Sequence, residues 1–222
     1  MIGLGGIPRP SDAQSFDTTR TSVPKSVQAS TIHTTFQWLE PDYKKDDFES
    51  REQYRKRMAE TPVDSKLRAV AISPPAYAFD AERQVLSIPL LHKQQRSEHW
   101  SDVPIYGYAD DLGLPVDYGL SVPTGSEFGH LLAQSDSNGI KLPVRHATAE
   151  AMRAKRVDCL VIFRLVRGDD SSPLWDKTSL QPGWDQGPEM YTWKYLYAEV
   201  IGLWLFDPSK KRLVIQKFAF AP

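Results

Sequence analysis

Three apolar segments in the last third of the chain constrain its fold more than any other feature. They are Val157–Val166, Lys194–Phe206 and Leu213–Phe220, and all are rich in β-branched and aromatic residues, which fit a pleated, packed surface. Lys194–Phe206 is apolar at both odd and even positions. Because side chains alternate between the two faces of a strand, this segment needs packing material on both faces. We therefore predict a layered β core built around it.

The charged side chain of Glu199 interrupts the apolar pattern inside the middle segment. In a buried strand its carboxylate must find a cation or stay protonated. Arg164 in the first segment and Lys217 in the third are the candidate partners. A structural ion pair is the favoured interpretation, and a catalytic carboxylate is the alternative.

The length and charge of the chain favour one globular domain without a nucleic-acid partner. The 222 residues suffice for a single domain with an arm. Residues 1–30 are rich in Ser, Thr, Pro and Gly and predict a flexible N-terminal arm, so residues 31–222 form the predicted single domain. The 27 basic and 28 acidic side chains give a net charge of −1, which provides no field for DNA or RNA.

The other segments complete an α+β fold with a predominantly antiparallel sheet, sandwich-like or curved, on which two helices pack. The predicted elements before the three C-terminal strands are a strand at Thr31–Leu39, a helix at Asp42–Thr61, a strand at Leu67–Ser73, a hairpin of Tyr77–Phe79 with Val85–Leu90, a hairpin of Phe128–Ala133 with Ile140–Val144 around an Asn-Gly turn, and a helix at Thr148–Lys155.

The segment Gly168–Trp193 lacks periodicity and is longer than most loops in a compact domain. Its large aromatic side chains argue against disorder and form a surface suited to a protein partner or a flat ligand such as a sugar ring. The predicted binding residues are Trp175, Trp184, Tyr191 and Trp193. The alternative is a loop folded over the sheet edge, with its tryptophans covering the core.

The motifs in the chain predict neither a cofactor nor a metal. The five histidines form no HExxH or HxH pattern, and Cys159 is the single cysteine, which excludes a CxxC site and an intramolecular disulfide. Cys159 lies in an apolar segment, where it is expected to be a small buried side chain.

The tetrapeptide Tyr108–Asp111 (YADD) resembles the motif of reverse transcriptases, whose paired aspartates hold Mg²⁺ for nucleotidyl transfer. The resemblance covers four of 222 residues, and the chain is short of the palm-and-fingers length that such an enzyme needs. The net charge also argues against a nucleic-acid channel. A turn with solvated aspartates is the interpretation we favour.

Two hypotheses for function follow. The first is a non-enzymatic binding or assembly protein that engages a protein partner or a second copy through the aromatic loop and the N-terminal arm. The alternative is a hydrolase-like enzyme whose acid–base groups converge from distant positions, with Glu199, His99 and Asp111 as candidates. No apolar run is long enough for a membrane span, and no signal peptide is visible. We expect a cytoplasmic protein, or an exported one if Met1 caps a processed chain.

Overall fold

The computed structural model describes residues 16–72, 78–88, 94–95, 97–110, 114–135, 139–145, 148, 157–181 and 189–221. The helices are α1 (Thr31–Tyr43), α2 (Arg51–Glu60) and α3 (Glu127–Ala133). The strands are β1 (Arg68–Ile72), β2 (Ala78–Asp80), β3 (Val85–Ile88), β4 (Gln94–Gln95), β5 (Trp100–Ala109), β6 (Pro115–Pro123), β7 (Ile140–Pro143), β8 (Asp158–Leu165), β9 (Leu174–Gln181), β10 (Glu189–Asp207) and β11 (Leu213–Ala219).

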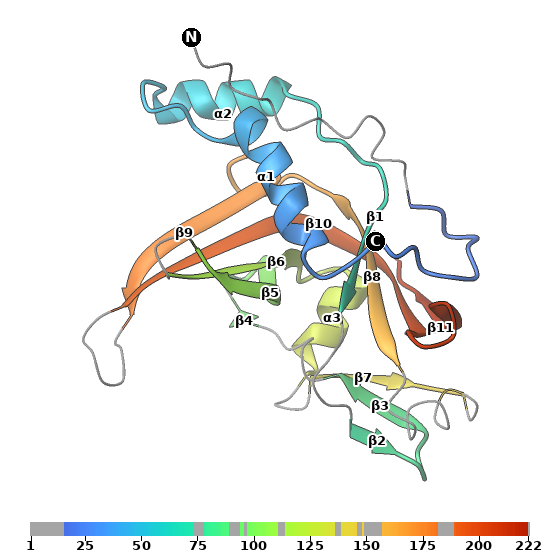
Figure 1. The fold of residues 1–222 in the computed structure, drawn as a ribbon. Helices are drawn as coiled ribbons and strands as arrows, with labels where there is room; N and C mark the ends of the chain where they lie inside the picture. Colours follow the sequence, from blue (N-terminus) through green and yellow to red (C-terminus); the bar gives the residue numbers. More distant parts are fainter. Residues whose placement is uncertain are drawn as a thin grey trace.

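The 19-residue strand β10 organises the fold (Figure 1). Its first half pairs with β9 on one side and β6 on the other, and its second half pairs with β8 and β11. The resulting eight-stranded sheet contains β1-β8-β10-β6-β5-β4 with β9 and β11 also on β10, and β2-β3-β7 form a second sheet. The α+β prediction is confirmed. The sheet is mixed rather than purely antiparallel, because β10 and β6 run parallel.

The predicted block of three C-terminal strands is confirmed, since β10 lies between β8 and β11. A bulge corrects the predicted alternation within it. Val200 pairs with Phe163 and Gly202 pairs with Ile162, so Ile201 is an extra residue on β10. Such a bulge exchanges the two faces of a strand beyond it. Leu203 therefore lies in the same core as Val200. Glu199 precedes the bulge and does not share a face with Leu203.

Two apolar cores lie on opposite faces of the sheet. The larger one joins the sheet to α1, α3 and the small sheet β2-β3-β7. The smaller one includes Trp204 and Phe206 of β10 and is covered by Phe16 and Val23 from the N-terminal segment. Phe16 packs edge-on to Trp204 with ring centroids 5.4 Å apart. The described residues 16–30 thus lie against the sheet, while the division into an arm and a single domain stays a prediction.

The strand expected at Thr31–Leu39 is wrong, because these residues belong to α1. The residues that α1 buries include Ile32, Phe36 and Tyr43, which have helical spacing. His33 also holds the helix on the sheet, since its ring lies 4.7 Å from that of Tyr118 and 5.0 Å from that of Tyr108. Burial lowers the pKa of His33, and its buried Nε2 has no hydrogen-bond partner, so the ring sits there as a neutral aromatic group.

The helix predicted at Asp42–Thr61 is confirmed only in its second half, where α2 lies. A capping box starts α2 at Ser50, whose side chain accepts from the backbone N–H of Gln53 while the Gln53 side chain accepts from the backbone N–H of Ser50. The residues before Ser50 end α1 and form a turn. The acidic residues at the start of the segment and the basic residues at its end match the macrodipole of a single helix, so they did not reveal the break between α1 and α2.

Two further predictions are corrected by the strand pairing. Phe128–Ala133 belongs to α3 rather than to a hairpin, and β7 pairs with β3 instead. The aperiodic loop expected at Gly168–Trp193 contains strand β9 and the start of β10, which form an antiparallel hairpin. The predicted strand β1 and the β2–β3 hairpin are confirmed.

Two expectations concern segments of other kinds. The helix expected at Thr148–Lys155 lies outside the described residues apart from Thr148. Within the described part of the chain, no helix has the length and apolar character needed to cross a membrane.

Candidate functional site

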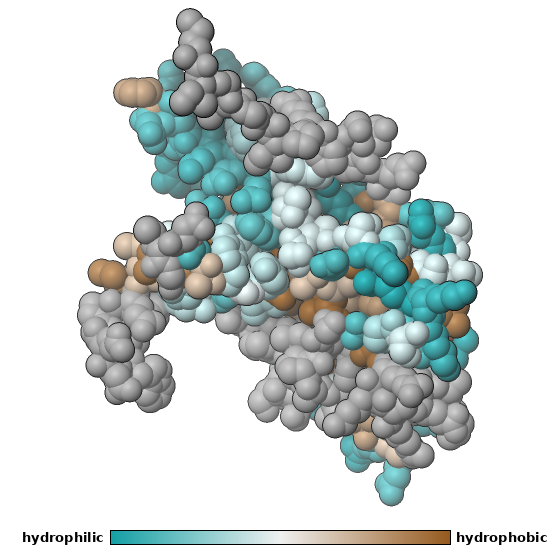
Figure 2. Space-filling view, viewed as in Figure 1, coloured by the Kyte–Doolittle hydropathy of each residue, from teal (hydrophilic) through white to brown (hydrophobic). Residues whose placement is uncertain are grey.

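A cavity of about 380 Å³ lies between the α1–α2 region and the start of β9. In Figure 2 the helical end and the β9–β10 hairpin extend to the same side of the molecule, with an indentation between them. We call this space the aromatic cavity. It is lined by Phe36, Glu40, Tyr43, Lys44, Lys45, Tyr54, Asp170, Leu174, Trp175, Asp176 and Tyr197. Its volume falls in the range usual for small-molecule sites, about 300–1,000 Å³.

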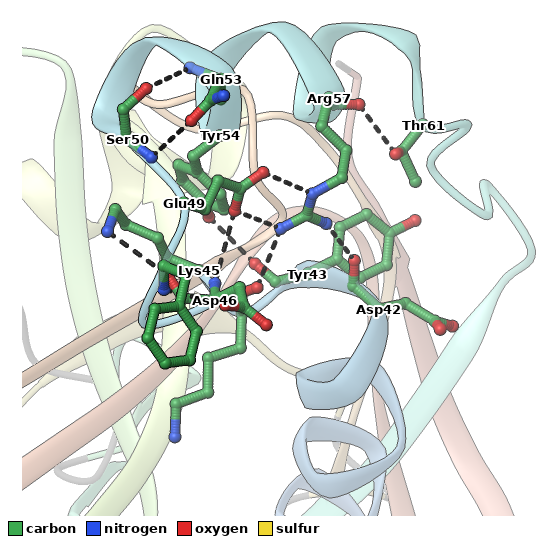
Figure 3. Close-up of polar contacts among 12 residues, drawn as sticks. Asp42, Tyr43, Lys45, Asp46, Glu49, Ser50, Gln53, Tyr54, Arg57 and Thr61 are labelled. Atoms are coloured by element: carbon green, nitrogen blue, oxygen red, sulfur yellow. Dashed lines mark hydrogen bonds and ion pairs between the residues drawn. The ribbon is translucent and has the colours of Figure 1, made fainter.

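The helical wall of the cavity is held by a hydrogen-bonded turn between α1 and α2 (Figure 3). Arg57 of α2 donates to both carboxylate oxygens of Glu49 at 2.8 Å and to the carbonyl oxygens of Asp42 at 2.9 Å and Lys44 at 3.0 Å. The same guanidinium holds the pKa of the Glu49 carboxyl below its ordinary value. Because these contacts fix the turn, Lys44 and Lys45 project from a defined backbone.

Two tyrosines join α1 to α2 and to the segment that follows α2. Tyr43 donates its hydroxyl to the carbonyl of Pro62 at 2.6 Å, and Tyr54 donates to the carbonyl of Tyr43 at 2.9 Å. Burial raises the pKa of both phenols, so they remain neutral donors. Both rings line the aromatic cavity.

The strand wall is built from aromatic residues that pack against other parts of the sheet. The Trp175 ring packs against that of Tyr195, its cross-strand partner on β10, with ring centroids 5.5 Å apart. Tyr197 packs against Trp100 at 4.5 Å and lies so close to Gly168 that a Cβ there would be 2.0 Å from the ring. These contacts leave little freedom to the aromatic rings on this side of the cavity.

The charges of the cavity are nearly balanced. Glu40 pairs with Lys44 at 3.5 Å and with Lys194 of β10 at 3.4 Å. Asp170 pairs with Arg55 of α2 at 3.0 Å. Lys45 and Asp176 form no ion pair within 4.0 Å with any described residue, and both are exposed at the rim. The cavity therefore has aromatic walls, and both carboxylate acceptors and ammonium donors surround them.

The predicted binding residues are placed differently by the structure. Trp175 lines the cavity, whereas Trp184 lies outside the described residues. Tyr191 and Trp193 lie on β10 with rings 4.9 Å apart, and the Tyr191 hydroxyl donates to Asp117 at 3.3 Å. Register places Tyr191 and Trp193 on the face of the hairpin that carries Trp175, but neither lines the cavity.

The candidate acid–base residues of the hydrolase hypothesis do not assemble in the described part of the chain. Glu199 is buried and accepts a hydrogen bond from Arg164, its cross-strand partner on β8, as the structural interpretation expects. His99 is exposed, and no hydrogen bond or ion pair between described residues joins it to Glu199. Asp111 lies outside the described residues.

The Tyr108–Asp111 tetrapeptide falls at the end of β5 and in the turn toward β6. Asp110 accepts from the backbone N–H of Leu114 at 2.9 Å, so its carboxylate closes this turn. Among the described residues, no group of three or more His, Cys, Asp or Glu side chains could hold a metal ion.

Several cavity residues escaped sequence reasoning because α1 was expected to be a strand. On a helix, Phe36, Glu40 and Tyr43 follow at i, i+4 and i+7 and share one face. That spacing was the signal available for them. Asp170 and Asp176 had no comparable signal, since the folding of β9 brings them to the cavity.

The chain matches no protein-family model, no curated protein and no solved structure.

Proposed function

We propose that this protein is a non-enzymatic binding protein whose ligand site is the aromatic cavity, and that the ligand is a sugar ring. The observation that carries the proposal is the position of Trp175, a half-buried tryptophan at the wall of a cavity of suitable volume. A flat aromatic surface packs against the apolar face of a sugar ring.

The charge of the cavity supports a neutral, hydroxyl-rich ligand. The lining has three carboxylates and two ammonium groups, and Glu40 and Asp170 already have cationic partners. A strongly charged ligand would meet groups of its own sign. A sugar instead uses both donors and acceptors, with Lys45 and Asp176 at the rim as the groups that have no ion-pair partner among the described residues.

The alternatives have less support in the described residues. For a hydrolase, Glu199 would have to leave its ion pair with Arg164. For a protein partner, the exposed large apolar side chains are Phe48, Leu180, Met190 and Leu213, which are distributed over the α1–α2 turn, the β9–β10 hairpin and β11. Leu180 and Met190 are cross-strand partners, whereas Phe48 and Leu213 lie on separate elements. Single exposed apolar residues and small pairs of them are ordinary on protein surfaces. A protein partner or a second copy stays a prediction.

Replacement of Trp175 with Ala is expected to weaken sugar binding about 30-fold, since truncation of an aromatic anchor costs roughly 2 kcal/mol. Saturation-transfer NMR against a panel of methyl glycosides identifies the ligand, and calorimetry gives its affinity for each variant. The matched control is Trp193→Ala, which removes a tryptophan from the same hairpin outside the cavity. Equal weakening by both variants would remove the support for this site.

A further inference from the structure

On another side of the molecule, the N-terminal segment lies beside the β10–β11 hairpin (Figure 1). A second cavity lies between the N-terminal segment and the turn that joins β10 to β11. Its volume is about 450 Å³, and we call it the basic cavity. Its lining consists of Val23, Lys25, Gln28, Pro208, Lys211 and Arg212. All six residues belong to the described part of the chain.

The two segments that form the basic cavity are tied together by the backbone. Val23 donates its N–H to the carbonyl of Arg212 at 2.9 Å, and Val214 donates to the carbonyl of Thr21 at 2.8 Å. The Arg212 side chain adds a hydrogen bond from Nη2 to the carbonyl of Val27 at 2.7 Å. The cavity is therefore a fixed feature between segments almost 200 residues apart in the sequence.

The charged residues that line the basic cavity are all cations. The nearest acidic residue of the turn, Asp207, is already engaged by the backbone N–H groups of Ser209 and Lys210 and by the Ser209 hydroxyl. Lys210 also lies 3.9 Å from this carboxylate. Asp207 thus stabilises the turn and does not line the cavity, where the charged lining residues are Lys25, Lys211 and Arg212.

Arg212 has unused donor capacity. Its guanidinium carbon lies 4.9 Å from the centroid of the Phe206 ring, and Nη2 is used by Val27. Its buried Nε has no hydrogen-bond partner. Burial lowers the pKa of this guanidinium, and the charge of Asp158 acts in the opposite direction. A cation that is partly desolvated, with donors unfilled, gains from an anion placed beside it.

The backbone of the turn strengthens this observation. Lys211 and Arg212 have φ angles of 53° and 56°, in the left-handed region where Gly and Asn are usual and bulky residues are strained. Two consecutive cations stand there instead, facing the same cavity.

We propose that the basic cavity binds a phosphate group, with Lys25, Lys211 and Arg212 as the contacting cations. Ammonium and guanidinium groups are the side chains that recognise phosphate oxygens. The cavity is larger than one phosphate needs, so the group belongs to a larger molecule, either a soluble phosphate ester or the headgroup of an anionic lipid. This site is separate from the aromatic cavity and independent of its sugar ligand.

The test uses pyrophosphate as the probe and isothermal calorimetry on the full chain. The double variant Lys25→Gln/Lys211→Asn is expected to bind pyrophosphate about tenfold or more weakly, and binding by the unaltered protein is expected to weaken as salt is raised. Asn is tolerated at the left-handed position of Lys211, so the variant keeps its fold, which a thermal melt checks. The control is Lys210→Asn, which removes the same charge from the same turn but not from the cavity lining.

Vesicles distinguish the two sources of the phosphate group. Binding to phosphatidylcholine vesicles that contain phosphatidylinositol 4-phosphate, with competition by pyrophosphate, indicates a lipid headgroup. Pyrophosphate binding without vesicle binding indicates a soluble ester. The proposal is overturned if the unaltered protein binds neither probe, or if Lys210→Asn weakens binding as much as the double variant does.

Discussion

Replacement of Gly119 with Ala is expected to destabilise the protein by about 3 kcal/mol, the largest effect of any substitution considered. Gly119 lies on β6 and pairs with Tyr195 of β10. A Cβ at this position would lie 2.3 Å from the Tyr195 ring and 2.3 Å from the carbonyl oxygen of Val103. Tyr195 is buried and contacts Trp175, so the ring has no open space to enter without moving the wall of the aromatic cavity. Urea denaturation measures the loss.

Gly125→Ala is the matched control for this substitution. No heavy atom lies within 4 Å of a Cβ built at Gly125, so its stability should change by less than about 0.5 kcal/mol. Near-UV circular dichroism should also change for Gly119→Ala, because Trp175 rests on the displaced ring. A Gly119→Ala variant as stable as the Gly125→Ala variant would contradict the packing of Tyr195 across β6.

Replacement of Arg164 with Met is expected to lower the free energy of unfolding by about 2 kcal/mol. The side chain of Glu199 is only 10% exposed, and loss of Arg164 leaves its carboxylate without the cation that it faces. Breaking a buried pair from one side costs roughly 3–5 kcal/mol, and we expect less because the Arg164 side chain is 43% exposed and partly screened by water.

The double variant Arg164→Met/Glu199→Leu is expected to recover most of that loss. Replacement of both members of a buried pair by apolar residues leaves no uncompensated charge and is often close to neutral. Urea denaturation of both single variants and the double variant gives the coupling between the two residues. If Arg164→Met is as stable as the unaltered protein, the Arg164–Glu199 ion pair does not stabilise the contact between β8 and β10. That result would contradict a structural role for Glu199.

Long apolar segments were the part of the fold that could be predicted from sequence. The strands β8 and β10 were visible as apolar segments, and they are buried along β8 and from Tyr195 onward in β10, whereas the residues of β11 are only half-buried or exposed. Arg164 and Lys217 were the expected partners of Glu199, and the structure pairs Glu199 with Arg164. The bulge at Ile201 was not visible, because it depends on how β10 aligns with β8. Register is a property of two strands, and neither sequence carries it alone.

Helix α1 and strand β9 were missed for physical reasons. In Thr31–Leu39, alternate residues from Ile32 to Trp38 happen to match the period of a strand, but burial of Ile32 and Phe36 in the larger core favours a helix over that local pattern. Strand β9 is an edge strand with an exposed middle, so it lacks the apolar period that marks a buried strand. The aromatic residues were therefore expected on a loop, whereas Trp175, Tyr191 and Trp193 lie on the β9–β10 hairpin. The sequence supplied neither the cavity nor its helical wall.

The basic cavity was also beyond prediction. Lys25 and Lys211 are far apart in the sequence, and each alone is an ordinary surface lysine. The bridge between Ser22 and Leu213 brings their segments together, which makes a local excess of positive charge in a chain whose net charge is −1.

The most direct test of the aromatic cavity as the ligand site is a titration of the ¹⁵N-labelled protein with methyl glycosides, followed through the tryptophan indole N–H signals. We expect the Trp175 signal to shift progressively to saturation, while Trp193, outside the cavity, and Trp204, in the smaller core, remain in place. An unchanged Trp175 signal across the panel, or shifts confined to Trp193, would contradict the account.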